Sequence, residues 1–174
     1  MDIAIGIATG LGLIGMVALL SKKGYLPGFS NFFGSTKFLF GYPRGVRNNN
    51  PGNIEMTKTL WKGEIPHHQN TDGRFKQFYS YTYGVRAAII NLKSYYNKGY
   101  RTIRQIISRW APPNENKTER YIQNVVRSSG IPDNTPIVFN KQTIKKLVKA
   151  IIMQENGKLY ITDEDFDKAW NLVS

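Results

Sequence analysis

The 174-residue chain contains no cysteine and only two histidines, His67 and His68, which are adjacent. The absence of cysteine excludes a disulfide framework, a thiolate metal site and a cysteine nucleophile. Two neighbouring histidines argue against most multi-histidine metal sites and against a Ser-His-Asp triad. The sequence also lacks the glycine-rich loops that bind nucleotide phosphates.

Positive charge, in contrast, is abundant. Twenty-four Lys and Arg residues against twelve Asp and Glu residues give a net charge of +12. This excess indicates a polyanionic partner, which could be nucleic acid, anionic lipid headgroups or an acidic cell-wall polymer. Apolar residues make up 41% of the chain and aromatic residues 13%, so the composition excludes disorder of the whole chain.

The N-terminus carries a long uncharged segment, from Ile3 to Leu20, followed by Lys22 and Lys23. Eighteen such residues are just long enough for a helix to cross a bilayer. A secretory signal peptide is the alternative, but it would place basic residues before the apolar run and a cleavage site after it. We therefore expect a retained transmembrane anchor over residues 1–23.

Residues 24–44 form an expected linker that is rich in Gly, Pro and aromatic residues, and residues 45–174 form the expected domain. Short runs at 53–55, 60–61 and 75–78 predict a small β-hairpin or three-stranded sheet. Apolar periodicity predicts helices over about 83–97, from about 103 to Pro112, over 117–129, over 142–155, and from Thr162 to about 173. The expected fold is thus α+β and mostly helical, with a small β-hairpin and a preceding N-terminal transmembrane helix.

One carboxylate occupies a position where the helical pattern predicts an apolar residue. Glu155 lies four residues after Ile151 and seven after Val148, so it falls on the apolar stripe of its helix. Partial burial and the negative end of the helix dipole both disfavour the charged form. A carboxylic acid that keeps its proton is what a general acid needs for cleaving a glycosidic bond. The alternative is a frayed helix end that turns Glu155 to solvent.

Other polar residues are weaker candidates. Glu55, Glu64 and Asp72 lie in or near the expected hairpin and could face a cleft, or could be solvated loop charges. The expected fourth helix has a basic outer face that could contact nucleic acid or anionic cell wall, or could simply be solvated; it consists of Lys141, Lys145, Lys146 and Lys149.

Several longer stretches resemble phage-encoded peptidoglycan-degrading domains of the lysozyme-like superfamily, which contains lytic transglycosylases and flagellar-type glucosaminidases. The resemblance covers essentially all of residues 45–160. It is carried by 45–54 (GVRNNNPGNI), 61–63 (WKG), 72–75 (DGRF) with Phe78, 83–87 (YGVRA), 102–103 and 106–107 (TI, II), 109–113 (RWAPP), Glu115, Asn116, Thr118 with Tyr121 and Ile122, and Ala150 to Ile152 with 155–157 (ENG).

The resemblance implies Glu155 as the catalytic residue, with Glu55 and Glu115 as rivals. In that superfamily the catalytic Glu usually ends a helix before the hairpin, whereas here the corresponding helix comes last, which implies a permuted order of elements. The residues implied in substrate binding are Asn50, Asn53, Thr118 and Tyr121. The sequence patterns predict no cofactor and no metal site.

The expected function is that of a virion-associated, membrane-anchored enzyme that cleaves the β-1,4 glycan strand of peptidoglycan during genome entry or host lysis. Because no convincing second carboxylate is evident, a lytic transglycosylase is favoured over a lysozyme. The expected partners are peptidoglycan, the lipid bilayer and other virion proteins, with nucleic acid less favoured. The alternative is a non-enzymatic structural virion membrane protein that binds cell wall or links capsid and membrane.

Overall fold

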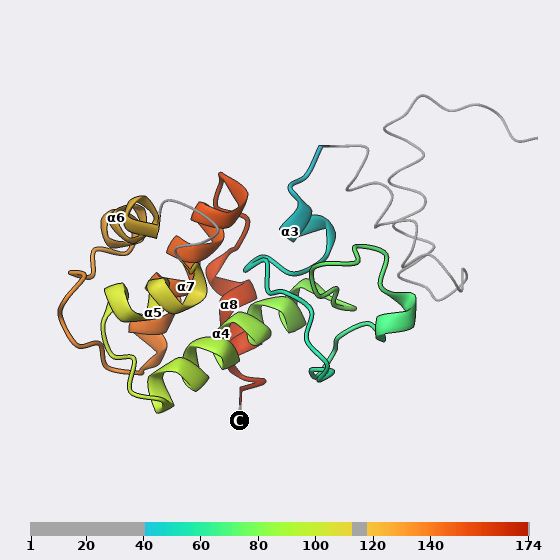
Figure 1. Ribbon diagram of the computed structural model, residues 1–174, viewed down its shortest axis with the longest axis horizontal. Coiled ribbons are helices and arrows are strands. Elements are labelled where there is room, and N and C mark those ends of the chain that lie inside the picture. Colours follow the sequence, from blue (N-terminus) through green and yellow to red (C-terminus); the bar gives the residue numbers. More distant parts are fainter. Residues whose placement is uncertain (1–40, 113–117, 174) are drawn as a thin grey trace, which may run out of the picture. The chain divides into compact units, whose positions relative to one another are not determined.

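The computed structural model describes residues 41–112 and 118–173 (Figure 1). The chain divides into two compact units, Met1–Gly41 and Tyr42–Ser174, and the second contains the fold discussed below. The anchor expected over residues 1–23 and nearly all of the linker expected over 24–44 lie outside the described residues. Within the described part, no helix combines the length and the apolar character needed to cross a membrane.

Six α-helices and one short 3-10 helix occupy the described residues (Figure 1). They are α3 (Arg44–Arg47), η1 (His67–Gln69), α4 (Tyr81–Asn97), α5 (Ile103–Trp110), α6 (Thr118–Ser129), α7 (Lys141–Asn156) and α8 (Asp163–Trp170). The five longer helices correspond to the five that the periodicity predicts, with starts and ends that differ by up to three residues. The short helix α3 was not predicted.

Local capping explains where these helices begin and end. The Ser80 side chain accepts a hydrogen bond from the backbone N–H of Tyr83 at the start of α4. Thr102 and Thr162 form capping boxes at the starts of α5 and α8. Helix α7 ends at Gly157, whose φ of 73° is a left-handed conformation that glycine adopts without steric cost.

The helices α4 to α8 bury one large apolar core. Helix α6 packs on α7, α4 packs on α8, and α5 packs on α6. Fully buried aliphatic side chains of α4, α5 and α7 fill this core, among them Ile89, Ile107 and Ile151. A second, smaller cluster joins Ile54 and Phe78 of the loop region to Ala87 and Ala88 of α4. Trp110, the last residue of α5, packs against both clusters.

The expected α+β fold with a β-hairpin is wrong. The described residues contain helices and two isolated antiparallel bridges, Glu55 with Phe75 and Glu64 with Phe78, but no strand. Residues 74–79 pair first with 54–56 and then with 63–65, through bonds such as Lys76 N–H to Ile54 O and Ile65 N–H to Gln77 O. Because the partner changes after two or three residues, neither ladder becomes long enough to form a strand.

Asparagine side chains organise this region in place of a longer ladder. Asn50 is fully buried; its amide donates to the carbonyls of Ile54 and Lys76 and accepts from the Ile54 N–H. Asn49 donates to the Phe78 carbonyl, and Asn49 and Asn53 both have positive φ. Each side chain thus satisfies backbone groups that a regular sheet would otherwise pair.

The Asn-rich loop also fits closely against the first turn of α4. A Cβ atom added at Gly84 would lie 1.7 Å from the carbonyl oxygen of Asn49, so this position requires glycine. The close approach fixes the loop of residues 48–53 beside α4. It thereby places Asn53 near the C-terminal end of α7.

Candidate active site

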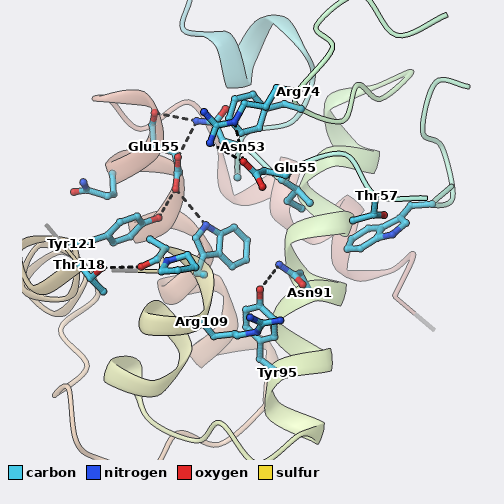
Figure 2. Close-up of a pocket in the computed structure, with 18 of the residues that line it drawn as sticks. Asn53, Glu55, Thr57, Arg74, Asn91, Tyr95, Arg109, Thr118, Tyr121 and Glu155 are labelled. Carbon is cyan, nitrogen blue, oxygen red and sulfur yellow. Dashed lines mark hydrogen bonds and ion pairs between the residues drawn. The ribbon is translucent and has the colours of Figure 1, made fainter. Parts of the chain in front are cut away.

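A cleft of about 720 Å³ lies between the loop region and the helices. Gly52 to Glu55, Thr57, Trp61, Arg74 and Phe75 contribute its loop wall, and α4 contributes Asn91, Tyr95 and the capping residue Lys98. The remaining lining residues come from the end of α5, the start of α6 and the end of α7, and include Arg109, Trp110, Thr118, Arg120, Tyr121, Gln154 and Glu155. Figure 2 shows these side chains converging from both sides.

Glu155 is the best-held carboxylate in the cleft. Tyr121 Oη donates to its Oε1 at 2.7 Å, and Trp110 Nε1 donates to the same oxygen at 3.3 Å. Asn53 Nδ2 donates to Oε2 at 2.9 Å (Figure 2). Donors from the Asn-rich loop, α5 and α6 therefore fix one side chain of α7. Glu155 is half-buried, so it does not turn away to solvent as a frayed helix end would.

Tyr121 serves this carboxylate as a buried donor. Burial raises the pKa of the Tyr121 hydroxyl well above its usual range, and the charge of Glu155 and the hydrogen bond to it raise the pKa further. The phenol therefore keeps its proton at neutral pH and acts as a hydrogen-bond donor. Its geometry makes it a positioning residue for Glu155.

The two carboxylates in the described part of the cleft, Glu55 and Glu155, differ in their partners. Glu55 is exposed, and its Oε1 accepts from Arg74 Nε at 2.9 Å and Nη2 at 2.8 Å. An arginine thus compensates the charge of Glu55, whereas neutral donors hold Glu155. Glu115, the other rival, lies outside the described residues.

The remaining residues that the resemblance implies have different environments. Asn53 lies in the cleft and bonds Glu155. Thr118 also lines the cleft, but its hydroxyl donates to the Ala111 carbonyl at 2.9 Å, which connects the two ends of the segment 112–117. Asn50 does not line the cleft; its buried side chain holds the loop through the backbone of Ile54 and Lys76.

Sequence reasoning missed the role of Trp110. The apolar spacing of its helix places it among core residues, and its ring does pack there, at 6.3 Å and nearly perpendicular to the ring of Tyr95. Its indole N–H nevertheless reaches Glu155. Buried tryptophans usually find an acceptor for this N–H, which is the one general signal that could have indicated such a partner.

Candidates outside the cleft have structural partners. Glu64 and Lys76 form a fully buried ion pair, and Nε2 of His67 lies 3.4 Å from Glu64 Oε1. Asp72 lies beneath Arg44 and accepts from Asn48. On the basic face of α7, Lys141, Lys145 and Lys149 pair with Asp163 or Asp167 of α8. Three of the four lysines of that face therefore share two carboxylates within the fold.

No family model matches the chain. The chain is 38% identical over 131 residues to protein P5 of Pseudoalteromonas phage PM2, a match that covers 73% of this chain and 79% of protein P5. The chain belongs to the protein P5 family. This membership confirms the expected relation to phage proteins. Family membership assigns no enzymatic activity to the chain. The lysozyme-like activity that the sequence resemblance implies therefore stays a prediction.

The contact between Tyr121 and Glu155 can be tested without any substrate. Replacing Glu155 with Gln removes the charge that raises the Tyr121 pKa, whereas burial and a hydrogen bond to the Gln carbonyl remain. We expect the Tyr121 pKa to fall towards its ordinary range in Glu155→Gln, although burial keeps it raised. NMR titration of protein with ¹³C-labelled tyrosine measures this, with Tyr121→Phe to assign the signal. An unchanged Tyr121 titration in Glu155→Gln would contradict the contact.

Proposed function

We propose that this chain cleaves the β-1,4 glycan strand of peptidoglycan, with Glu155 as the proton donor. The observation that supports this most directly is a single glutamate, held by three neutral donors, at the wall of a cleft large enough for sugar rings. The ring surfaces of Trp61, Trp110 and Tyr95 in the same cleft suit the apolar faces of sugars.

The hydrogen-bond geometry suggests how the proton is placed. Oε1 of Glu155 already accepts two hydrogen bonds, whereas Oε2 accepts one from a side chain. In the protonated form of Glu155, the proton therefore lies on Oε2, the oxygen that accepts fewer hydrogen bonds. From there it would transfer to the glycosidic oxygen as the bond to the anomeric carbon breaks.

A transglycosylase route needs no second carboxylate. The 6-hydroxyl of the muramic residue attacks its own anomeric carbon, its proton passes to the Glu155 carboxylate, and the product carries an internal 1,6-ether. A hydrolase would use a second carboxylate to direct water. In the described part of the cleft, Glu55 is the other carboxylate and Arg74 already engages it. We therefore favour the transglycosylase route.

A second candidate is a non-enzymatic component of the phage particle that binds cell wall through the same cleft. Membership in the protein P5 family supports this candidate directly, because it indicates a phage protein without indicating catalysis. In either case we propose that the protein acts in the virion, in association with other virion proteins.

Incubation of the full chain with purified peptidoglycan tests the proposal. We expect soluble muropeptides whose masses are lower by one water than those of the hydrolysis products. Hydrolysis products without the internal ether would favour a lysozyme mechanism and direct attention to Glu55. Binding of peptidoglycan with no released fragments would overturn the enzyme and support the structural component.

A further inference from the structure

The cleft contains a second group of residues that Glu155 chemistry does not require. Lys98, Arg109 and Arg120 all line it, and all three side chains are exposed. Within residues 41–112 and 118–173, none of the three forms an ion pair with an acidic side chain. They belong to three different helix ends, the C-terminal ends of α4 and α5 and the first turn of α6.

Several other basic side chains of the domain have acidic partners. Arg104 binds Glu119 and Asp133, Lys76 is buried with Glu64, and the lysines of α7 pair with α8. Lys98, Arg109 and Arg120 have no such partner among the described residues, and they lie together in one cleft. Together with Arg74, they give the described part of the cleft four basic side chains against two acidic ones, Glu55 and Glu155.

Arg120 is the most informative of the three. Lys98 and Arg109 lie at helix C-termini, where the helix dipole stabilises a cation, so their positions have an ordinary explanation. Arg120 lies in the first turn of α6, where the dipole disfavours positive charge. The acidic residue of that turn, Glu119, forms an ion pair with Arg104 and not with Arg120. The described part of the fold thus supplies no acidic partner that accounts for a cation at this position.

The sugar backbone of a glycan does not explain this charge. Hydroxyl and acetamido groups are neutral, and aromatic rings and amide groups are sufficient to bind them. Carboxylates, in contrast, form charge-assisted hydrogen bonds with arginine, and these are stronger than neutral ones. On a peptidoglycan strand, carboxylates occur in the peptide stems, and a lactyl group exposes a carboxylate only where its stem has been removed.

We propose that Lys98, Arg109 and Arg120 bind the carboxylates of peptide-bearing glycan strands, so that the cleft selects anionic strands over neutral β-1,4 glycans. This inference rests on the proposed function, because it assigns a substrate class to the same cleft. It assigns these residues to substrate selection and leaves the proton transfer to Glu155.

The test measures binding separately from cleavage, in the Glu155→Gln background. Affinities are compared for solubilised strands that carry peptides, for strands from which an amidase has removed the peptides, and for neutral chitohexaose. Arg109→Gln combined with Arg120→Gln removes two cleft charges. The matched control combines Lys93→Gln with Lys146→Gln. Both lysines are exposed and lie outside the cleft, and their replacement removes two positive charges, as in the cleft variant.

We expect the cleft double variant to bind peptide-bearing strands at least about tenfold more weakly, as loss of charged hydrogen bonds implies. Chitohexaose binding should change little, and the control should lose less than about twofold on any ligand because its two lysines lie outside the cleft. Stripped strands expose lactyl carboxylates in place of the stem carboxylates, so an equal loss with both kinds of strand shows that the cleft binds either carboxylate. A loss confined to peptide-bearing strands identifies the peptide stems as the ligands.

Three results would overturn the inference. The first is a chitohexaose affinity equal to that for peptide-bearing strands. The second is an equal loss of affinity in the cleft and control variants. The third is a single-stranded oligodeoxynucleotide that binds more tightly than peptide-bearing strands and depends on the same arginines. Absence of cleavage by the wild-type chain, with the affinity differences intact, would instead overturn only the enzymatic proposal. The two failures are therefore distinguishable.

Discussion

Replacing Glu155 with Gln is expected to lower glycan cleavage by about 10²–10⁴-fold, the usual cost of removing a general acid or base. Gln has the same shape but cannot supply a proton. The fragments released from peptidoglycan, quantified by mass spectrometry, measure the effect. Glu164→Gln is the matched control, because Glu164 is an exposed residue of α8 that pairs with Lys168 far from the cleft lining. It should cleave like the wild type.

The Glu155→Gln chain should also fold normally. The Gln carbonyl can accept the hydrogen bonds of Tyr121 and Trp110, while its amide would face the Asn53 amide. Asn53 can adapt, because its buried Oδ1 has no hydrogen-bond partner in the described part of the protein. Rotation of the Asn53 amide turns this acceptor towards the new donor. We therefore expect the unfolding midpoint of Glu155→Gln to equal that of the wild type although cleavage is lost.

Glu55→Gln distinguishes the two routes. In the transglycosylase route it should lower cleavage much less than Glu155→Gln, because Glu55 binds Arg74 and takes no part in the proton transfer. A complete loss in Glu55→Gln with activity retained in Glu155→Gln would reverse the assignment of the two carboxylates. Full activity in both variants of a cleaving protein would contradict the lysozyme-like mechanism itself.

The helices were predictable from the sequence because their signals are local. Apolar spacing identifies the buried faces of α4, α5 and α7, and Thr102, Thr162 and Gly157 mark helix ends through capping. The same spacing placed Glu155 on the apolar stripe of α7, and the structure places it at the cleft end of that stripe. These inferences need no knowledge of distant parts of the chain.

The hairpin prediction failed because the relevant contacts are not local. The runs 53–55 and 75–78 have the composition of strands, but the buried amide of Asn50 takes the backbone groups of Ile54 and Lys76. Likewise, nothing in the spacing of residues shows that Asn53 and Glu155, 102 positions apart, form a hydrogen bond. Only the packing of the Asn-rich loop against α4 and α7 brings them together.

Removing one partner of the buried ion pair between Glu64 and Lys76 is expected to lower the stability of the fold strongly. Both side chains are fully inaccessible to solvent, and Lys76 Nζ donates to the two carboxylate oxygens at 3.0 and 2.8 Å. Glu64 Oε2 also accepts the backbone N–H of Trp61 at 2.8 Å. Glu64→Ala would leave a buried ammonium without its counter-charge. We expect a loss of about 3–5 kcal/mol in the free energy of unfolding, measured by urea denaturation.

The matched control for this loss is Glu164→Ala. It breaks the exposed pair with Lys168 in α8 and should cost less than about 1 kcal/mol. The combined variant Glu64→Leu with Lys76→Met removes both charges and keeps apolar volume, so it should regain most of the stability lost in Glu64→Ala. A combined variant as unstable as Glu64→Ala would show that packing or the Trp61 contact, and not the unpaired charge, sets the cost.

The same pair connects stability to the cleft. Lys76 Nζ lies 5.3 Å from the centre of the Trp61 ring, and Glu64 holds the Trp61 backbone, so both partners position an aromatic residue of the cleft wall. The combined apolar variant should therefore recover its fold but bind glycan strands more weakly than the wild type, because Trp61 loses both contacts. Wild-type binding in that variant would show that Trp61 is held by its apolar neighbours alone. Weak binding with recovered stability would assign the ion pair to shaping the cleft.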